Sequence, residues 1–176
     1  MSPIDRLQQG IDAFTDATGR VLAWLSLVMM LVLCLVVALR YGFEIGSVAL
    51  QETVTYLHGT IFMLGAAYTL KRDGHVRVDI FYHTFSPRAK AWVNSLGGII
   101  FLLPLCVYIF MVSLDFVRQS WLIHEVSSEP GGLPAVFLLK TLIPLMAANL
   151  GLQALAEILR NARLLVATQP GNGEAR

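Results

Sequence analysis

Four long stretches with almost no charge constrain the fold of this chain more than any other feature. They cover residues 21–39, 53–70, 93–114 and 133–156, and Lys140 is the only Asp, Glu, Lys or Arg within them. A helix of 19 residues is roughly 28 Å long, close to the thickness of a bilayer's hydrocarbon core. The sequence therefore predicts an all-α integral membrane protein with four transmembrane helices in a membrane domain of residues 21–158.

Charge and composition support a chain that is surrounded by lipid. Only 14% of the 176 residues are charged, whereas soluble domains carry about 25%. The net charge of +1 gives no reason to expect nucleic acid as a partner. Membrane lipid is thus the expected surrounding.

Lysine and arginine fall unevenly on the two sides of the predicted membrane domain. One side holds ten of them: Arg6, Arg20, Lys71, Arg72, Arg77, Arg88, Lys90, Arg160, Arg163 and Arg176. The other side holds three: Arg40, Arg118 and Lys140. Because short cytoplasmic segments carry the excess of positive charge, both termini and the middle loop are expected in the cytoplasm of a bacterial inner membrane protein.

Two segments outside the spans are expected to form short amphipathic helices along the membrane. Residues 1–20 place Ile4, Leu7, Ile11 and Phe14 on one helical stripe, with an acidic polar face opposite. The alternative for this segment is a helical lead-in to the first span. For residues 71–85, an interfacial helix is favoured but helix against strand stays open, and residues 159–176 are read as a cytoplasmic tail.

No grouping of side chains predicts catalysis, a cofactor or a metal. His58 is the only histidine inside a span, so paired axial ligation of a haem is poorly supported. Cys34 and Cys106 lie in apolar runs without a metal-ligand spacing. No span has a carboxylate at mid-depth, where proton and ion paths need one. A non-enzymatic transporter subunit is the favoured reading; the alternatives are a haem or quinone redox protein and a stand-alone homodimeric exporter.

A few charged residues near the span ends are candidate structural or partner contacts. They are Arg40, Glu52, Glu125, Glu129 and Lys140. Arg40 is expected to pair with Glu52 or Glu44, the alternative being an anchor to lipid headgroups. Lys140 is expected to reach the interface through its long stem, and Glu125 and Glu129 to meet a partner or water.

Short motifs in a fixed order extend from about Trp24 to Ile158. Ser86-Pro87 also predicts the N-cap and first residue of the third membrane helix. The motifs are Arg40-Tyr41, Gln51-Glu52, Leu64-Gly65-Ala66-Ala67-Tyr68, Gly74-His75-Val76-Arg77-Val78-Asp79, Ser86-Pro87-Arg88-Ala89 and Gly131-Gly132-Leu133-Pro134, followed by Lys140 and Pro144. In order and spacing the chain resembles the DctQ-type small membrane subunit of tripartite ATP-independent periplasmic (TRAP) transporters. It differs in having Gln51-Glu52 where many relatives have two acidic residues.

The resemblance implies a definite role. Such a subunit has four spans, cytoplasmic termini, no catalytic centre and no cofactor. It binds and braces a large membrane subunit, which carries the substrate and sodium sites. A periplasmic solute-binding protein delivers the solute, often an organic acid.

Overall fold

The computed structural model describes residues 3–74, 82 and 84–167, and this part of the chain is helical with no strand. Its elements are α1 (Pro3–Gly42), α2 (Val48–Lys71), α4 (Pro87–Gly97), η1 (Gly98–Leu102), α5 (Leu103–Leu122) and α6 (Val136–Ala167). The segments α4, η1 and α5 follow one another without a break. The all-α fold is thus confirmed for the described residues.

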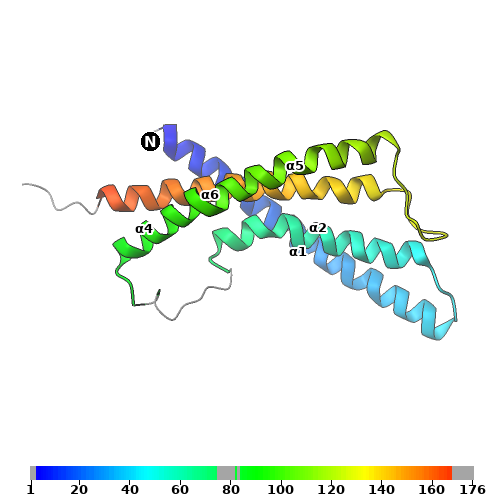
Figure 1. Ribbon diagram of the computed structural model, residues 1–176. Coiled ribbons are helices and arrows are strands. Elements are labelled where there is room, and N and C mark those ends of the chain that lie inside the picture. Colours follow the sequence, from blue (N-terminus) through cyan, green and yellow to red (C-terminus); the bar gives the residue numbers. More distant parts are fainter. Residues whose placement is uncertain (1–2, 75–81, 83, 168–176) are drawn as a thin grey trace, which may run out of the picture.

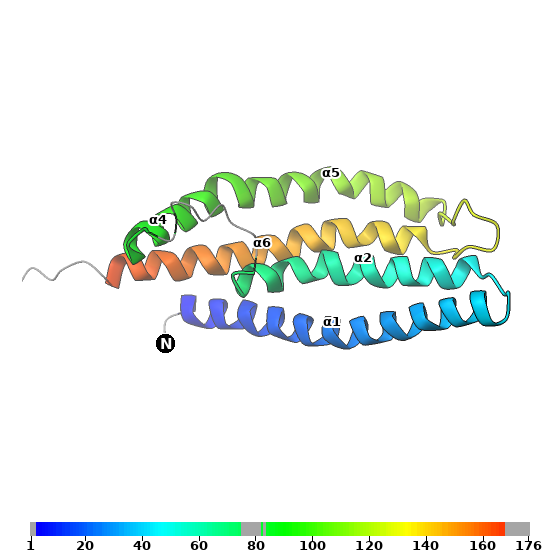
Figure 2. The ribbon, with the colours of Figure 1, turned by 90° about the horizontal axis from the view of Figure 1, so that it is seen from below.

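The long helices lie side by side in the order α1, α2, α6, α5 (Figure 2). The main contacts are those of α1 with α2, α2 with α6, and α6 with α5, while α4 packs on α6. This arrangement is an open layer, since α1 and α5 form its two edges instead of closing a bundle. Accordingly only 6% of the most apolar stretch of α1 is buried, against 33% of that of α6.

Three helical stretches are long and apolar enough to cross a membrane. They are Pro3–Gly42, Pro87–Leu122 and Val136–Val166. The shorter α2 has 24 residues but carries Tyr56, His58 and several threonines, which lower its mean hydropathy. The membrane class is therefore confirmed, whereas the crossing by α2, and with it the count of four spans, stays a prediction.

The N-terminal segment is not a separate short helix, which corrects the predicted boundary at residue 20. Residues 3–20 are the first half of the 40-residue α1, and no proline between Ile4 and Gly42 interrupts this helix. Ile11, Thr15 and Leu22 are its buried residues, spaced so that one face continues across the boundary. The structure therefore agrees with the alternative interpretation, in which residues 3–20 are a helical lead-in to the first span.

The structure also bears on the predicted C-terminal tail and on the segment before the third span. The helix α6 continues to Ala167, so the first part of the predicted tail is helical. Most of the segment 71–85 lies outside the described residues, and the choice between helix and strand there stays a prediction. The predicted N-cap is confirmed, since Ser86 Oγ accepts a hydrogen bond from Ala89 N–H at 3.3 Å and Pro87 is the first residue of α4.

Proline also explains the widened turn within the third apolar stretch. Pro104 has no N–H to donate to the preceding turn. Immediately before it, η1 takes up a π-helical turn in which Leu103 N–H bonds Gly98 C=O. Such a turn absorbs one residue without ending the helix.

Candidate interaction sites at the two ends of the layer

The layer has two ends, which can be followed in Figure 1. We call the end that carries residues 43–47 and 123–135 the loop end. We call the other the terminal end; it holds the start of α1, the end of α2 and the end of α6. Hydrogen bonds and ion pairs join different segments at both ends. All five sequence-predicted contact residues, Arg40, Glu52, Glu125, Glu129 and Lys140, lie at or near the loop end.

Glu52 fastens the start of α2 to the loop that precedes α6. Its Oε2 accepts a hydrogen bond from Leu133 N–H at 2.6 Å, and its Oε1 accepts one from the Ser127 hydroxyl. The Ser127 bond and then the Leu133 bond hold the pKa of the Glu52 carboxyl below its ordinary value of 4.5. Ser127 Oγ in turn accepts from Glu129 N–H at 3.1 Å.

Lys140 is paired within the protein, and its side chain reaches a loop residue at the loop end; that it lies at the membrane interface stays a prediction. Its Nζ lies 2.5 Å from Glu125 Oε2 and 4.1 Å from the centre of the Phe116 ring. The hydrogen bond from Lys140 lowers the pKa of Glu125 from 4.5. This pair joins α6 to the loop after α5, next to the Glu52 contacts.

The predicted pairing of Arg40 with Glu52 or Glu44 is wrong. Both oxygens of Glu52 are engaged by the second loop, and among the described residues no ion pair includes Arg40 or Glu44. Arg40, Glu44 and Glu129 are exposed. The connection from Arg40 to Glu52 is short in sequence, but α2 packs on α6, so its first turn meets the loop that leads into α6.

At the terminal end a polar network is built around two fully buried side chains. Thr15 Oγ1 donates to Gln153 Oε1 at 2.8 Å, and Gln153 Nε2 donates to Asp12 Oδ1 and Glu157 Oε1, each at 3.3 Å. Arg160 donates to both Asp12 oxygens at 3.1 and 2.9 Å and to Glu157 at 2.7 Å. The network joins α1 to α6.

Further ion pairs connect α1 to α2 and to the end of α6. Lys71 Nζ lies 2.7 Å from Asp16 Oδ2 and donates to the Asp12 carbonyl at 2.7 Å, and Arg163 pairs with Asp5. The acidic face of residues 3–20 therefore binds basic residues of its own chain. Sequence reasoning missed this, although aspartates seven and four residues apart, facing a basic final helix, are a usable signal.

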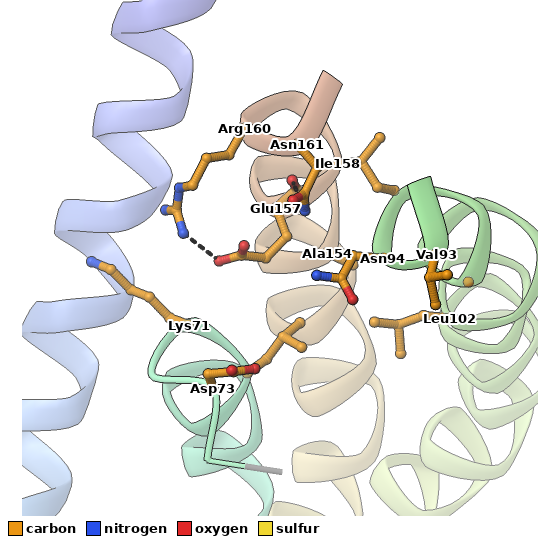
Figure 3. Close-up of a pocket in the computed structure, with 13 residues that line it drawn as sticks. Lys71, Asp73, Val93, Asn94, Leu102, Ala154, Glu157, Ile158, Arg160 and Asn161 are labelled. Atoms are coloured by element: carbon orange, nitrogen blue, oxygen red, sulfur yellow. Dashed lines mark hydrogen bonds and ion pairs between the residues drawn. The ribbon is translucent and has the colours of Figure 1, made fainter. Parts of the chain in front are cut away.

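A cavity of about 410 Å³ lies beside this network, between the end of α2, α4 with η1, and α6 (Figure 3). Its polar lining is Lys71, Asp73, Asn94, Glu157, Arg160 and Asn161. Figure 3 shows Lys71 and Arg160 directed toward α1, where their partners lie. The cations of the cavity are thus already paired. In the described part of the chain no three His, Cys, Asp or Glu residues are grouped to hold a metal ion.

Membrane-length apolar helices in an open layer, tied together by polar groups at both ends, define an all-α integral membrane protein. The family of tripartite ATP-independent periplasmic transporters, DctQ component, matches residues 29–164. The chain belongs to this family, which is a transporter component and not a family of enzymes. No curated protein and no solved structure shows a significant match.

Proposed function

We propose that this chain is the small membrane subunit of a sodium-coupled, binding-protein-dependent TRAP transporter for an organic acid, and that it braces the large transport subunit. Its partners are then that subunit, a periplasmic solute-binding protein and the surrounding lipid. All four helices cross the bacterial inner membrane, and the terminal end faces the cytoplasm. Family membership supports the assignment, and the distribution of Lys and Arg supports the orientation.

The observation that carries the bracing role is the open layer with tied ends. A layer one helix thick leaves two broad faces free for a larger partner, whereas a closed bundle would bury them. Glu52 and the Glu125–Lys140 pair fix the loop end, and the buried Thr15–Gln153 pair fixes the terminal end. Since the connections at both ends hold the helices in place, the layer supplies a preformed surface.

Reconstitution with and without the large subunit tests the proposal. Vesicles containing only this chain should take up no organic acid in a sodium gradient, because the sodium and solute sites are expected on the large subunit. Co-expressed with that subunit, the chain should copurify in detergent. Vesicles with both subunits and the binding protein should show sodium-driven uptake, and omitting this chain should abolish it.

The same preparations contain the outcomes that would contradict the proposal. Sodium-driven uptake by vesicles with this chain alone would favour the stand-alone exporter. A haem or quinone absorption band in the purified chain would favour the redox protein. Failure of the chain to copurify with the large subunit would remove the bracing role.

A further inference from the structure

The exposed surface of α2 is a single stripe. Of its 24 residues, those that are exposed are Gln51, Thr55, His58 and Phe62. Steps of four, three and four residues place them on one face of the helix. The stripe begins at the loop end and extends roughly 17 Å along α2, to about the middle of the predicted span.

This stripe is more polar than the exposed faces of the other helices within the predicted spans. The exposed residues of α1 between 21 and 39, of η1 and α5 up to residue 114, and of α6 up to residue 156 are apolar except for Trp24 and Tyr108, whose aromatic rings each carry one polar group. Apolar faces of this kind are suited to lipid tails. Three of the four exposed residues of α2 are polar, although α2 lies in the interior of the layer, between α1 and α6 (Figure 2).

His58 is the residue that lipid would accommodate least well. Its ring stacks on Phe62, with centroids 6.3 Å apart and planes inclined by 22°. Within the described chain the imidazole takes part in no hydrogen bond or ion pair. Thr55 donates to the Gln51 carbonyl of its own helix. Its hydroxyl oxygen and the His58 ring therefore retain hydrogen-bonding capacity on the outward face, which is costly to leave unused in hydrocarbon.

We infer that the Gln51–Thr55–His58–Phe62 stripe is the face of α2 against which a membrane helix of the large subunit packs, presenting hydroxyl, amide or carboxyl groups to Thr55 and His58. This inference rests on the proposed function and names the contact surface. Polar complementarity selects a protein helix over lipid, since side chains satisfy one another across membrane helices and lipid tails cannot. Phe62, which is 73% exposed, adds an aromatic anchor at the inner end of the stripe.

Photocrosslinking in the co-expressed complex tests where the partner lies. A photoreactive benzoylphenylalanine is introduced in place of Thr55 or His58, and, as matched controls, in place of Leu31 in α1 or Val107 in α5. All four residues are exposed, but the controls lie on apolar faces. Illumination should join the α2 positions to the large subunit and leave the control positions without a protein adduct.

Substitution by leucine gives a second measurement, for which a stripe that faces lipid and a stripe that contacts the large subunit give opposite expected results. If the stripe faced lipid, Thr55→Leu with His58→Leu would leave the complex intact, because leucine is more favourable in hydrocarbon. If the stripe instead contacts polar groups of the large subunit, the double substitution should lower the retention of that subunit in detergent about tenfold. This is the loss expected for two or three interhelical hydrogen bonds. Met30→Leu on the exposed face of α1 is the control and should change nothing.

The outcomes separate this inference from the proposed function. Copurification with no adduct from α2, adducts from the controls instead, or an adduct that joins two copies of this chain would overturn the inference and leave the subunit assignment standing. Unchanged retention in the double leucine variant would also overturn it. Absence of copurification in the unsubstituted protein would overturn both.

Discussion

At the scale of single residues, Glu52 shows how one carboxylate connects two distant segments. It stands at the beginning of α2, yet its two oxygens bind Ser127 and Leu133, which are 75 and 81 residues away. Glu125 and Lys140 form a second contact beside it. The loop end is thus held by ionised carboxylates, which makes it sensitive to acid.

The pKa of Glu52 and that of Glu125 are both lowered from 4.5 in the folded protein. Groups with a lowered folded pKa stabilise the fold fully above their unfolded pKa, and the stabilisation is lost as the pH falls through the folded value. We therefore expect the thermal midpoint of the purified chain in detergent to be constant from pH 7 to about pH 5, and to decrease as the pH falls below about 4.5.

Glu52→Gln should lower the midpoint by a few degrees at pH 7, because an amide offers one acceptor oxygen where the carboxylate offers two. The same variant should lose part of the acid dependence. Gln51→Ala, one residue earlier on the exposed face, is the comparison in the isolated chain and should retain the full dependence. An unchanged acid response in Glu52→Gln would show that other carboxylates are responsible.

At the scale of helices, the close approach of α1 and α2 depends on a glycine. A β-carbon at Gly19 would lie 2.8 Å from Cγ of the Tyr68 ring, with other ring atoms closer still. Since ring atoms near the backbone cannot swing away cheaply, α2 and α1 approach closely at Gly19. Gly10, two and a half turns earlier in the same helix, has nothing within 4 Å of such a carbon.

This pair of glycines offers a matched test of the packing. Gly19→Ala should destabilise the protein by about 1–3 kcal/mol through overpacking, even though alanine is the better helix former. Gly10→Ala should be neutral or stabilise by up to about 1 kcal/mol. Denaturant unfolding in detergent, followed by helical circular dichroism, measures both. In a Tyr68→Ala background the two substitutions should become equivalent, and equal stability in the parent chain would contradict this packing.

At the scale of the whole molecule, the ion pairs bring together three segments that the charge distribution places on one side of the membrane. Asp12 and Asp16 of α1, Lys71 of α2 and Arg160 of α6 are all in contact at the terminal end. The residues 123–135 lie at the opposite end (Figure 1). If the positive-inside rule holds for this chain, the terminal end is cytoplasmic.

Thiol labelling tests this orientation. With Cys34 and Cys106 first replaced, a cysteine in place of the exposed Glu129 should react with an impermeant reagent in intact cells. A cysteine in place of Ala162, which is exposed near Arg163 at the other end, should react only after the membrane is opened. The opposite pattern would reverse the assignment of the two ends.

The sequence by itself determined the class of the protein. Apolar runs of membrane length leave the backbone no alternative to helices in lipid, and local signals such as Ser86-Pro87 are enough to begin one. The candidate residues Glu52, Glu125 and Lys140 could be recognised because charges are rare near the ends of such runs. These inferences depend on interactions between near neighbours, or between one segment and its surroundings.

Only the tertiary structure decided which of these groups meet. The sequence suggested Arg40 for Glu52 because the two are close along the chain, whereas the packing of α2 on α6 gives Glu52 to Ser127 and Leu133. The same packing buries Thr15 against Gln153, 138 residues apart, and leaves the polar stripe of α2 outward. Periodicity states which residues share a face of one helix, but the order of helices in a layer arises from contacts between distant segments, which no single segment encodes.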